Sequence, residues 1–304
     1  VGTWLFIGVA MILVQVILGG VTRLTGSGLS ITEWQPLLGA LPPLNNQEWI
    51  VAFEKYQAHT SQFQFVNSHF TLADFKQIYF WEWMHREWAR LLGLVFILGF
   101  SYFLFKKKFT KEQLIPFVIL FLLGFLQGAI GWIMVKSGID ADNIYVSHIR
   151  LAIHFVMATL LGLYTLWFAI TTYFKDAYVT NGSSLVKATF ILIVLVLIQL
   201  VFGAFIAGLK CANVAATWPS INGDYIPTSI GNFDFLYDKI NIQFVHRTLA
   251  YIILILTIRW FFKARKLLVL QKNNILKNIY YLPLLFVCLQ VVLGITTLLS
   301  ATTI

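Results

Sequence analysis

A carboxylate, an imidazole and two guanidinium groups lie within nine residues of the sequence, just before a long apolar stretch. They belong to Glu82, His85, Arg86 and Arg90, and residues 91–105 that follow are mostly apolar. Ionisable groups beside hydrocarbon-like sequence are costly to bury, so they indicate a function. A positioned carboxylate can transfer protons or stabilise charge, which makes Glu82 the candidate catalytic residue.

Three histidines occupy similar positions, each near the start of an apolar stretch. They are His85, His154 and His246. A single histidine in a helix is more often a hydrogen-bonded core residue, but three at one level of related helices indicate metal ligands. No carboxylate or cysteine cluster accompanies them in the sequence to complete a zinc or di-iron site. Two imidazoles that face each other across a helix bundle suit the axial positions of a haem iron, so we predict haem-iron ligands.

Four arginines stand close to these histidines in the sequence. They are Arg86, Arg90, Arg150 and Arg247. Arg150 stands four residues before His154 and therefore shares a helix face with it. Because a guanidinium group pairs bidentately with a carboxylate, all four arginines are candidates for binding haem propionates. The alternative for each arginine is an interaction with lipid headgroups.

Composition and hydropathy place the chain in a membrane. Of its 304 residues, 59% are hydrophobic and 12% are charged, and the mean hydropathy is +0.78, whereas the apolar share of soluble domains is about half. Runs of about twenty apolar residues predict seven membrane-spanning helices, because a helix satisfies its backbone within each span. The predicted spans are 3–24, 78–105, 114–136, 145–174, 187–209, 241–263 and 279–303. The predicted fold class is an all-α polytopic membrane protein.

Lysine and arginine are unevenly distributed between the loops. The loops after the second, fourth and sixth spans hold most of them, so the positive-inside rule makes these loops cytoplasmic and places the N-terminus inside. The three histidines then lie towards the outer side of the membrane. The net charge of +9 follows from this topology and requires no nucleic-acid partner. A basic lipid-binding site is the alternative.

The sequence contains an internal repeat. A Gln-x-x-x-Gly motif occurs in every odd-numbered span, and the His-Arg sequence of the second span returns in the sixth. We therefore predict two tandem four-helix units, 1–174 and 187–304. The motif begins at Gln15, Gln127, Gln199 and Gln290. Its glutamine and glycine favour helix packing, although the glycine would also admit a flat porphyrin.

The repeat predicts a further helix with a fourth histidine. His154 follows Gln127 by 27 residues, so the second unit calls for a histidine near 290 + 27 = 317. Because the given sequence ends at Ile304, we expect an eighth helix beyond it that carries the fourth ligand. The alternative is a second unit with a single histidine ligand.

The two halves of the chain differ three residues before the histidine of their second span. Glu82 precedes His85, whereas Gln243 precedes His246. A carboxylate at one site only indicates that proton or charge chemistry is confined to the first unit, while a haem in the second unit only transfers electrons. The alternative is that Glu82 simply pairs with Arg86, four residues further on.

The first outer loop, 25–77, is long enough to cover the first site. It exceeds its counterpart by 23 residues, because 51 residues separate Trp34 from His85 and only 28 separate the corresponding tryptophan from its histidine. Trp49, Phe53 and Tyr56 have helical spacing, so we predict short amphipathic helices that serve as a lid or as interfacial anchors. Residues 71–74 form a predicted capping box before the second span.

Motifs spread over the whole chain resemble those of one known family. They include Gly19-Gly20-Val21-Thr22-Arg23-Leu24-Thr25, Glu33-Trp34, Pro42-Pro43, Glu82 with His85-Arg86, Trp88, Arg90, Arg150-Leu151-Ala152 with His154, Gly203-Ala204, Ala207-Gly208-Leu209, Trp218-Pro219 and His246-Arg247. In these motifs the chain resembles the haem A synthases. It is closer to their mitochondrial and proteobacterial branch, in which the first outer loop is long and lacks cysteines.

The resemblance implies an enzyme that converts haem O to haem A by successive oxygen-dependent hydroxylations of a porphyrin methyl group to a formyl group. It implies that His85 and His154 serve the substrate haem, and that His246 and the fourth histidine hold a haem b. It also makes Glu82 the essential glutamate. The implied membrane is the bacterial cytoplasmic or mitochondrial inner membrane. The implied partners are haem O synthase, the cytochrome oxidase assembly machinery and an electron donor, and a homo-oligomer is left open.

Some relatives carry cysteine pairs in their outer loops, but this chain departs from that pattern. The third outer loop has only Cys211, and Cys288 lies in the middle of the seventh span. We therefore predict no intramolecular disulfide, although the outer face is oxidising.

The main alternative function is that of a dihaem b-type cytochrome that passes electrons to or from quinone without oxygenation. Its histidines would be placed identically. Glu82 is the discriminating residue, because pure electron transfer has no evident use for a carboxylate at one site only.

Overall fold

The computed structural model describes residues 1–304 except 34–37, 140–142, 175–182, 233, 269–274 and 301–304. Helices dominate the described residues, and no strand is found among them beyond one isolated bridge between Ile221 and Asp224. The chain divides into two compact units, Val1–Ala177 and Tyr178–Ile304. Among the described residues, seven helices are long and apolar enough to cross a membrane, which confirms the predicted class of polytopic membrane protein.

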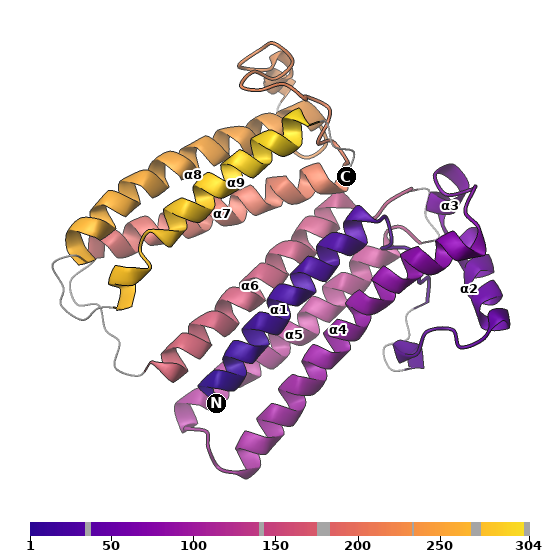
Figure 1. Ribbon diagram of the computed structural model, residues 1–304, viewed down its shortest axis with the longest axis horizontal. Coiled ribbons are helices and arrows are strands. Elements are labelled where there is room, and N and C mark those ends of the chain that lie inside the picture. Colours follow the sequence, from indigo (N-terminus) through magenta and orange to yellow (C-terminus); the bar gives the residue numbers. More distant parts are fainter. Residues whose placement is uncertain (34–37, 140–142, 175–182, 233, 269–274, 301–304) are drawn as a thin grey trace. The chain divides into compact units, whose positions relative to one another are not determined.

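The first unit contains four long helices: α1 (Gly2–Leu24), α4 (Leu72–Phe105), α5 (Lys111–Lys136) and α6 (His148–Tyr173). They run alongside one another, with α1 packed against both α4 and α6, and α5 packed against α6 (Figure 1). Buried side chains of α1, α5 and α6 form the core of this bundle. They are Leu5, Ile12, Phe117, Leu120, Leu161, Phe168 and Ala169.

The second unit contains α7 (Ser183–Gly208), α8 (Lys239–Leu268) and α9 (Leu282–Leu299), with the short 3₁₀ helices η2 (Thr228–Asn232) and η3 (Ile275–Asn278). α8 packs against both α7 and α9, and the three helices lie side by side in Figure 1. The contact between α7 and α8 repeats the contact between α1 and α4, because both join an odd-numbered span to the next even-numbered span.

The long outer loop folds against the beginning of α4. It contains η1 (Leu38–Ala40), α2 (Asn46–His59) and α3 (Ser61–Phe65), and α2 packs against α4. Trp49, Phe53 and Tyr56 lie on α2, as their helical spacing predicts, and they gather around Phe75 of α4. Tyr56 is completely buried; its hydroxyl donates to Gln62 Oε1 (3.2 Å) and accepts from the amide of Asn67 (2.8 Å).

The start of α4 is the largest difference from the predicted beginnings of the spans. α4 begins at Leu72 and not at 78, while the other six beginnings differ by at most four residues. The predicted capping box explains the earlier start: Thr71 N donates to Asp74 Oδ2 (2.9 Å), and Asp74 N donates to Thr71 Oγ1 (3.4 Å). Such a box satisfies two N–H groups that a helix start otherwise leaves without partners.

Candidate functional site

His85 lies against the Gln-x-x-x-Gly motif of α1. The side-chain amide nitrogen of Gln15 is 3.2 Å from each ring nitrogen of His85 and also donates to the His85 carbonyl oxygen (3.1 Å). A Cβ atom on Gly19 would stand only 3.1 Å from His85 Cε1. The motif of α1 therefore holds the histidine of α4 at close range.

His154 has the same surroundings on another pair of helices. Gln127 of α5 places its amide nitrogen 3.1 Å from His154 Nδ1 and donates to the His154 carbonyl oxygen (3.1 Å). A Cβ atom on Gly131 would stand 2.8 Å from His154 Cε1. The first unit therefore contains two copies of one arrangement, one on α1 and α4 and the other on α5 and α6.

His246 repeats the arrangement in the second unit with one difference. The amide nitrogen of Gln199 lies 3.2 Å from His246 Nε2, and a Cβ atom on Gly203 would stand 3.3 Å from His246 Cε1. The Nδ1 atom of His246 is buried and has no hydrogen-bond partner. We call the three arrangements the Gln–His pairs: Gln15–His85, Gln127–His154 and Gln199–His246.

The fourth Gln-x-x-x-Gly motif stands on α9. Gln290 is exposed, and a Cβ atom on Gly294 would meet no atom within 4 Å among the described residues. The histidine expected to face this motif belongs to the helix predicted beyond Ile304, so the fourth ligand stays a prediction.

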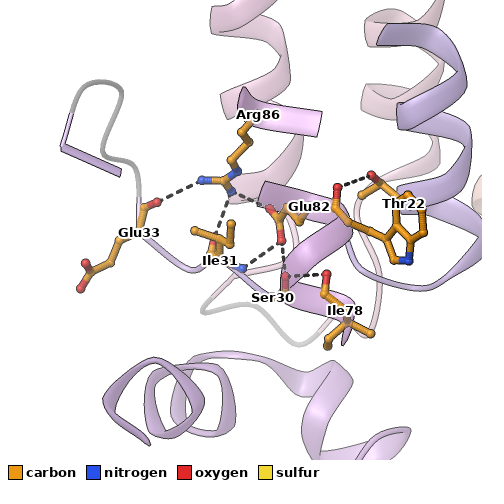
Figure 2. Close-up of polar contacts among 8 residues, drawn as sticks. Thr22, Ser30, Ile31, Glu33, Ile78, Glu82 and Arg86 are labelled. Carbon is orange, nitrogen blue, oxygen red and sulfur yellow. Dashed lines mark hydrogen bonds and ion pairs between the residues drawn. The ribbon is translucent and has the colours of Figure 1, made fainter. Parts of the chain in front are cut away.

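Glu82 fastens the outer loop to α4 (Figure 2). One carboxylate oxygen pairs with Arg86 Nη2 (2.6 Å), and the other accepts from Ser30 Oγ (2.8 Å) and Ile31 N (2.9 Å). Arg86 also donates to the carbonyl oxygens of Ile31 (3.0 Å) and Glu33 (3.2 Å). Glu82 is only 3% exposed. The pairing with Arg86 that the spacing allowed is therefore present, and the sequence offered no signal for the partners in the loop, about fifty residues away.

Gln243 and Arg247 hold the corresponding loop of the second unit. Gln243, which is 4% exposed, donates to the carbonyl oxygens of Cys211 (2.9 Å) and Ala212 (3.0 Å) and accepts from Arg247 Nε (3.2 Å). Arg247 donates further to the carbonyl oxygen of Thr217 (2.8 Å). The structure thus places Glu82 and Gln243 in the same position, each beside an arginine four residues on.

The two remaining candidate arginines have other partners. Arg90 pairs with Glu87 of its own helix, and Arg150 donates to the carbonyl oxygen of Ile133 (2.9 Å). Arg150 is exposed, whereas Arg90 is half-buried. Propionate binding by the four arginines stays a prediction, and the backbone contacts of Arg86 and Arg247 show that these two also serve the loops.

The donor atoms of the three Gln–His pairs fit a haem. Imidazole without a carboxylate is a common axial ligand of haem iron, and within the described residues no three His, Cys, Asp or Glu side chains gather to hold a bare metal ion. Each pair also leaves a buried glutamine Oε1 without a partner, and the third leaves His246 Nδ1 as well. The three glutamine oxygens could orient a ligating imidazole, because an imidazole bound to a metal through one nitrogen donates its other N–H to an acceptor.

Comparisons with known proteins show the family to which the chain belongs. The model of the cytochrome oxidase assembly protein family COX15-CtaA matches residues 2–304. The chain belongs to the COX15-CtaA family. Relatives named haem A synthase include those of Flavobacterium psychrophilum, 40% identical over 97% of this chain and 88% of the relative, and Maricaulis maris, 42% identical over 83% and 75%. That of Paracoccus denitrificans is 36% identical over 98% and 80%. No solved structure matches the chain.

Membership of the COX15-CtaA family confirms the resemblance seen in the motifs, including the proteobacterial relatives. In this COX15-CtaA chain no disulfide joins the two cysteines: Cys211 is buried three residues after the end of α7, and Cys288 is exposed on α9. Cys211 contributes through its backbone instead, because its carbonyl oxygen accepts from Gln243.

Proposed function

We propose that this chain is a haem A synthase that binds haem O in its first unit and haem b in its second. The observation that carries the proposal is the contrast between the units: both present histidine against a Gln-x-x-x-Gly motif, but only the first has a buried carboxylate, Glu82, three residues before its histidine. The family and the relatives named haem A synthase support the same function. Haem biosynthesis for a cytochrome oxidase is thus the role that best fits the chain.

In this proposal His85 and His154 hold the substrate haem O, and His246 holds haem b together with the fourth histidine. Haem O, when bound, supplies the methyl group that two hydroxylations and the loss of water turn into the formyl group of haem A, with molecular oxygen as co-substrate. Arg86, Arg90, Arg150 and Arg247 are the candidates for the propionates.

Glu82 would act on protons beside this site. As a carboxylate it can accept a proton at Oε2 when the Ser30 hydroxyl, which now donates to that oxygen beside the Ile31 amide, rotates and becomes the acceptor. Arg86 orients the other oxygen. Because the same contacts fasten residues 30–33 over α4, Glu82 would also help to exclude water from the first site.

The membrane and the partners belong to the proposal too. The excess of lysine and arginine in the loops after α4, α6 and α8 supports an N-terminus inside and histidines towards the outer side. We place the protein in a bacterial cytoplasmic or mitochondrial inner membrane, where haem O synthase, the oxidase assembly machinery and an electron donor are its partners.

Pigment analysis tests the proposal. The full-length protein is purified from a host that makes haem O, and its extracted haems are identified by mass spectrometry for the native chain, Glu82→Gln and Glu87→Gln. Glu87 is the matched control, because it stands on the same helix and pairs with Arg90, and its loss leaves that arginine available for a propionate. We expect haem A or hydroxylated haem O from the native chain and from Glu87→Gln, and neither from Glu82→Gln. Haem b as the sole pigment of the native protein would support the dihaem cytochrome instead.

A further inference from the structure

The Gln-x-x-x-Gly motifs contact the candidate ligands directly. We propose that the glutamines of the three Gln–His pairs are positioning residues: the amide orients each imidazole and, when the other ring nitrogen binds iron, turns so that its oxygen accepts the ring N–H. The inference rests on the proposed function in taking haem iron as the metal. It goes further in giving a task to Gln15, Gln127 and Gln199, which helix packing alone would leave as structural residues.

The first step is the double contact made by the amides in the first unit. The amide nitrogens of Gln15 and Gln127 each reach a ring nitrogen and also the backbone carbonyl oxygen of the same histidine. One contact limits the rotation of the ring, and the other fixes the position of the histidine backbone along the facing helix. An amide with two donors can make both contacts at once.

The glycine completes the arrangement by letting the ring approach. In all three pairs the ring atom nearest to the glycine is Cε1, the carbon between the two nitrogens. The same edge of each imidazole therefore faces the motif, at distances of 2.8–3.3 Å from the position of an added Cβ atom. Any larger residue would displace the ring, so the glycine sets the distance while the glutamine sets the orientation.

The unpaired atoms show what the amide can still do. The Oε1 atoms of Gln15, Gln127 and Gln199 are buried without a partner, and buried polar atoms are normally paired because an unsatisfied one destabilises the folded state. In the third pair both Gln199 Oε1 and His246 Nδ1 lack a partner. If the Gln199 amide turned away from Nε2, a hydrogen bond from His246 Nδ1–H to Gln199 Oε1 would satisfy both atoms and leave the Nε2 lone pair for iron.

Packing alone does not account for where the amides point. A glutamine that served only helix association could pair with any carbonyl of a neighbouring helix. On three separate pairs of helices the amide instead lies against the histidine ring. Gln199 contacts the ring of His246 without also donating to the His246 carbonyl oxygen. The shared element is thus the imidazole.

The experiment measures haem b and haem O separately in the purified full-length protein. Gln199→Met keeps the length of the side chain but removes its hydrogen bonds, and Gln199→Glu keeps an acceptor. Gln127→Met removes the hydrogen bonds of the corresponding glutamine in the first unit. Gln113→Met is the matched control, because Gln113 also uses its amide oxygen on α5, to cap Thr110 N (3.1 Å), far along the helix from Gln127. Haem content, the optical spectrum of the reduced haem and its midpoint potential are recorded.

We expect Gln199→Met to weaken haem b binding about 10–100-fold, the usual effect of losing a hydrogen-bond partner of a metal ligand. Its haem O content should stay unchanged, and Gln127→Met should show the reverse. Gln199→Glu should retain haem b with a lower midpoint potential, because a carboxylate acceptor makes the imidazole a stronger donor to iron. Gln113→Met should match the native protein in every measurement.

Native affinity, spectrum and potential of haem b in Gln199→Met would overturn the inference and leave Gln199 as a packing residue. Should that variant not fold, Gln199→Glu decides, since an unchanged potential contradicts the inference equally. Failure of the proposed function is distinguishable: a native protein that makes no haem A, while Gln199→Met still loses haem b, refutes the synthase and retains the positioning role.

Discussion

The loop after α1 and the loop after α7 are fastened to the next long helix by side chains at matching positions, but the hydrogen bonds run in opposite directions. In the first unit Glu82 accepts from Ser30 and from the Ile31 amide, so the loop supplies the donors. In the second unit Gln243 donates to two loop carbonyl oxygens, those of Cys211 and Ala212, so the loop supplies the acceptors.

Each loop therefore presents the hydrogen-bonding groups that its helix residue requires: donors to the glutamate and acceptors to the glutamine. A carboxylate can only accept hydrogen bonds, whereas an amide can also donate. The partners of the two arginines differ as well, since Arg86 forms an ion pair with Glu82 whereas Arg247 donates to the amide oxygen of Gln243. A buried carboxylate therefore stands three residues before His85, whereas the residue three before His246 is an amide beside an arginine.

The largest effect should come from removing Arg86. Arg86→Ala leaves the Glu82 carboxylate buried without its cation, which typically costs about 3–5 kcal/mol, and it also frees two loop carbonyl oxygens. Thermal unfolding of the purified protein should show the loss. The double variant Glu82→Gln/Arg86→Ala should recover part of it, and Arg150→Ala, which removes an exposed arginine, serves as control. Equal loss in the single and double variants would mean that the buried charge is not the cause.

Gln243→Glu tests the opposite direction of the second network. The new carboxylate would face the carbonyl oxygens of Cys211 and Ala212 without a proton to donate, and each buried acceptor left unpaired costs about 1–3 kcal/mol. Arg247 offsets part of this cost, so the effect should be smaller than that of Arg86→Ala. Hydrogen exchange of residues 211–222 should rise. Gln113→Glu is the control, because a carboxylate can still accept from Thr110 N; equal exchange in both variants would contradict the prediction.

Much of the fold could be predicted because hydropathy decides it. All seven spans follow from apolar runs, since a lipid-exposed helix needs them regardless of its neighbours. The start of α4 was wrong by six residues because Phe75 and its neighbours are buried by the outer loop, not by lipid. Local capping at Thr71 and packing of the loop set that boundary, and a hydropathy window detects neither.

Only those features of the site that recur in the internal repeat could be predicted from the sequence. Equal spacing brought out the histidines, the glutamines and the contrast between Glu82 and Gln243. It could not show that the glutamines touch the histidine rings, because that depends on which helices pack together. The donors of Ser30 and Ile31 were missed for a related reason: a loop conformation brings them to Glu82 from more than fifty residues away.

Alkaline pH should distinguish the two loops, because only the first contains the buried Tyr56. Burial raises the pKa of Tyr56 to about 12 from its ordinary value of 10. Since the folded loop holds this proton more tightly, its stability should be constant below pH 10 and should fall between pH 10 and 12, by about 1.4 kcal/mol for each pH unit. Hydrogen exchange of residues 45–67 measured against pH should show the transition. Tyr56→Phe should abolish it, and a transition that persists there would belong to another group.

The smallest effect should come from removing the N-terminal caps of α4 and α8, which lie at different distances from His85 and His246. Thr71 caps α4 fourteen residues before His85, whereas Asp238 caps α8 only eight residues before His246, by accepting from Asn241 N (2.7 Å). Removing either cap with alanine should cost about 1 kcal/mol. Because fraying spreads inward from a helix end, only Asp238→Ala should raise hydrogen exchange at the backbone amides of residues 243–247, while Thr71→Ala should leave residues 82–86 protected. Equal protection of both histidines after cap removal would show that the loop networks alone hold these turns, with Gln243 and Arg247 as effective as Glu82 and Arg86.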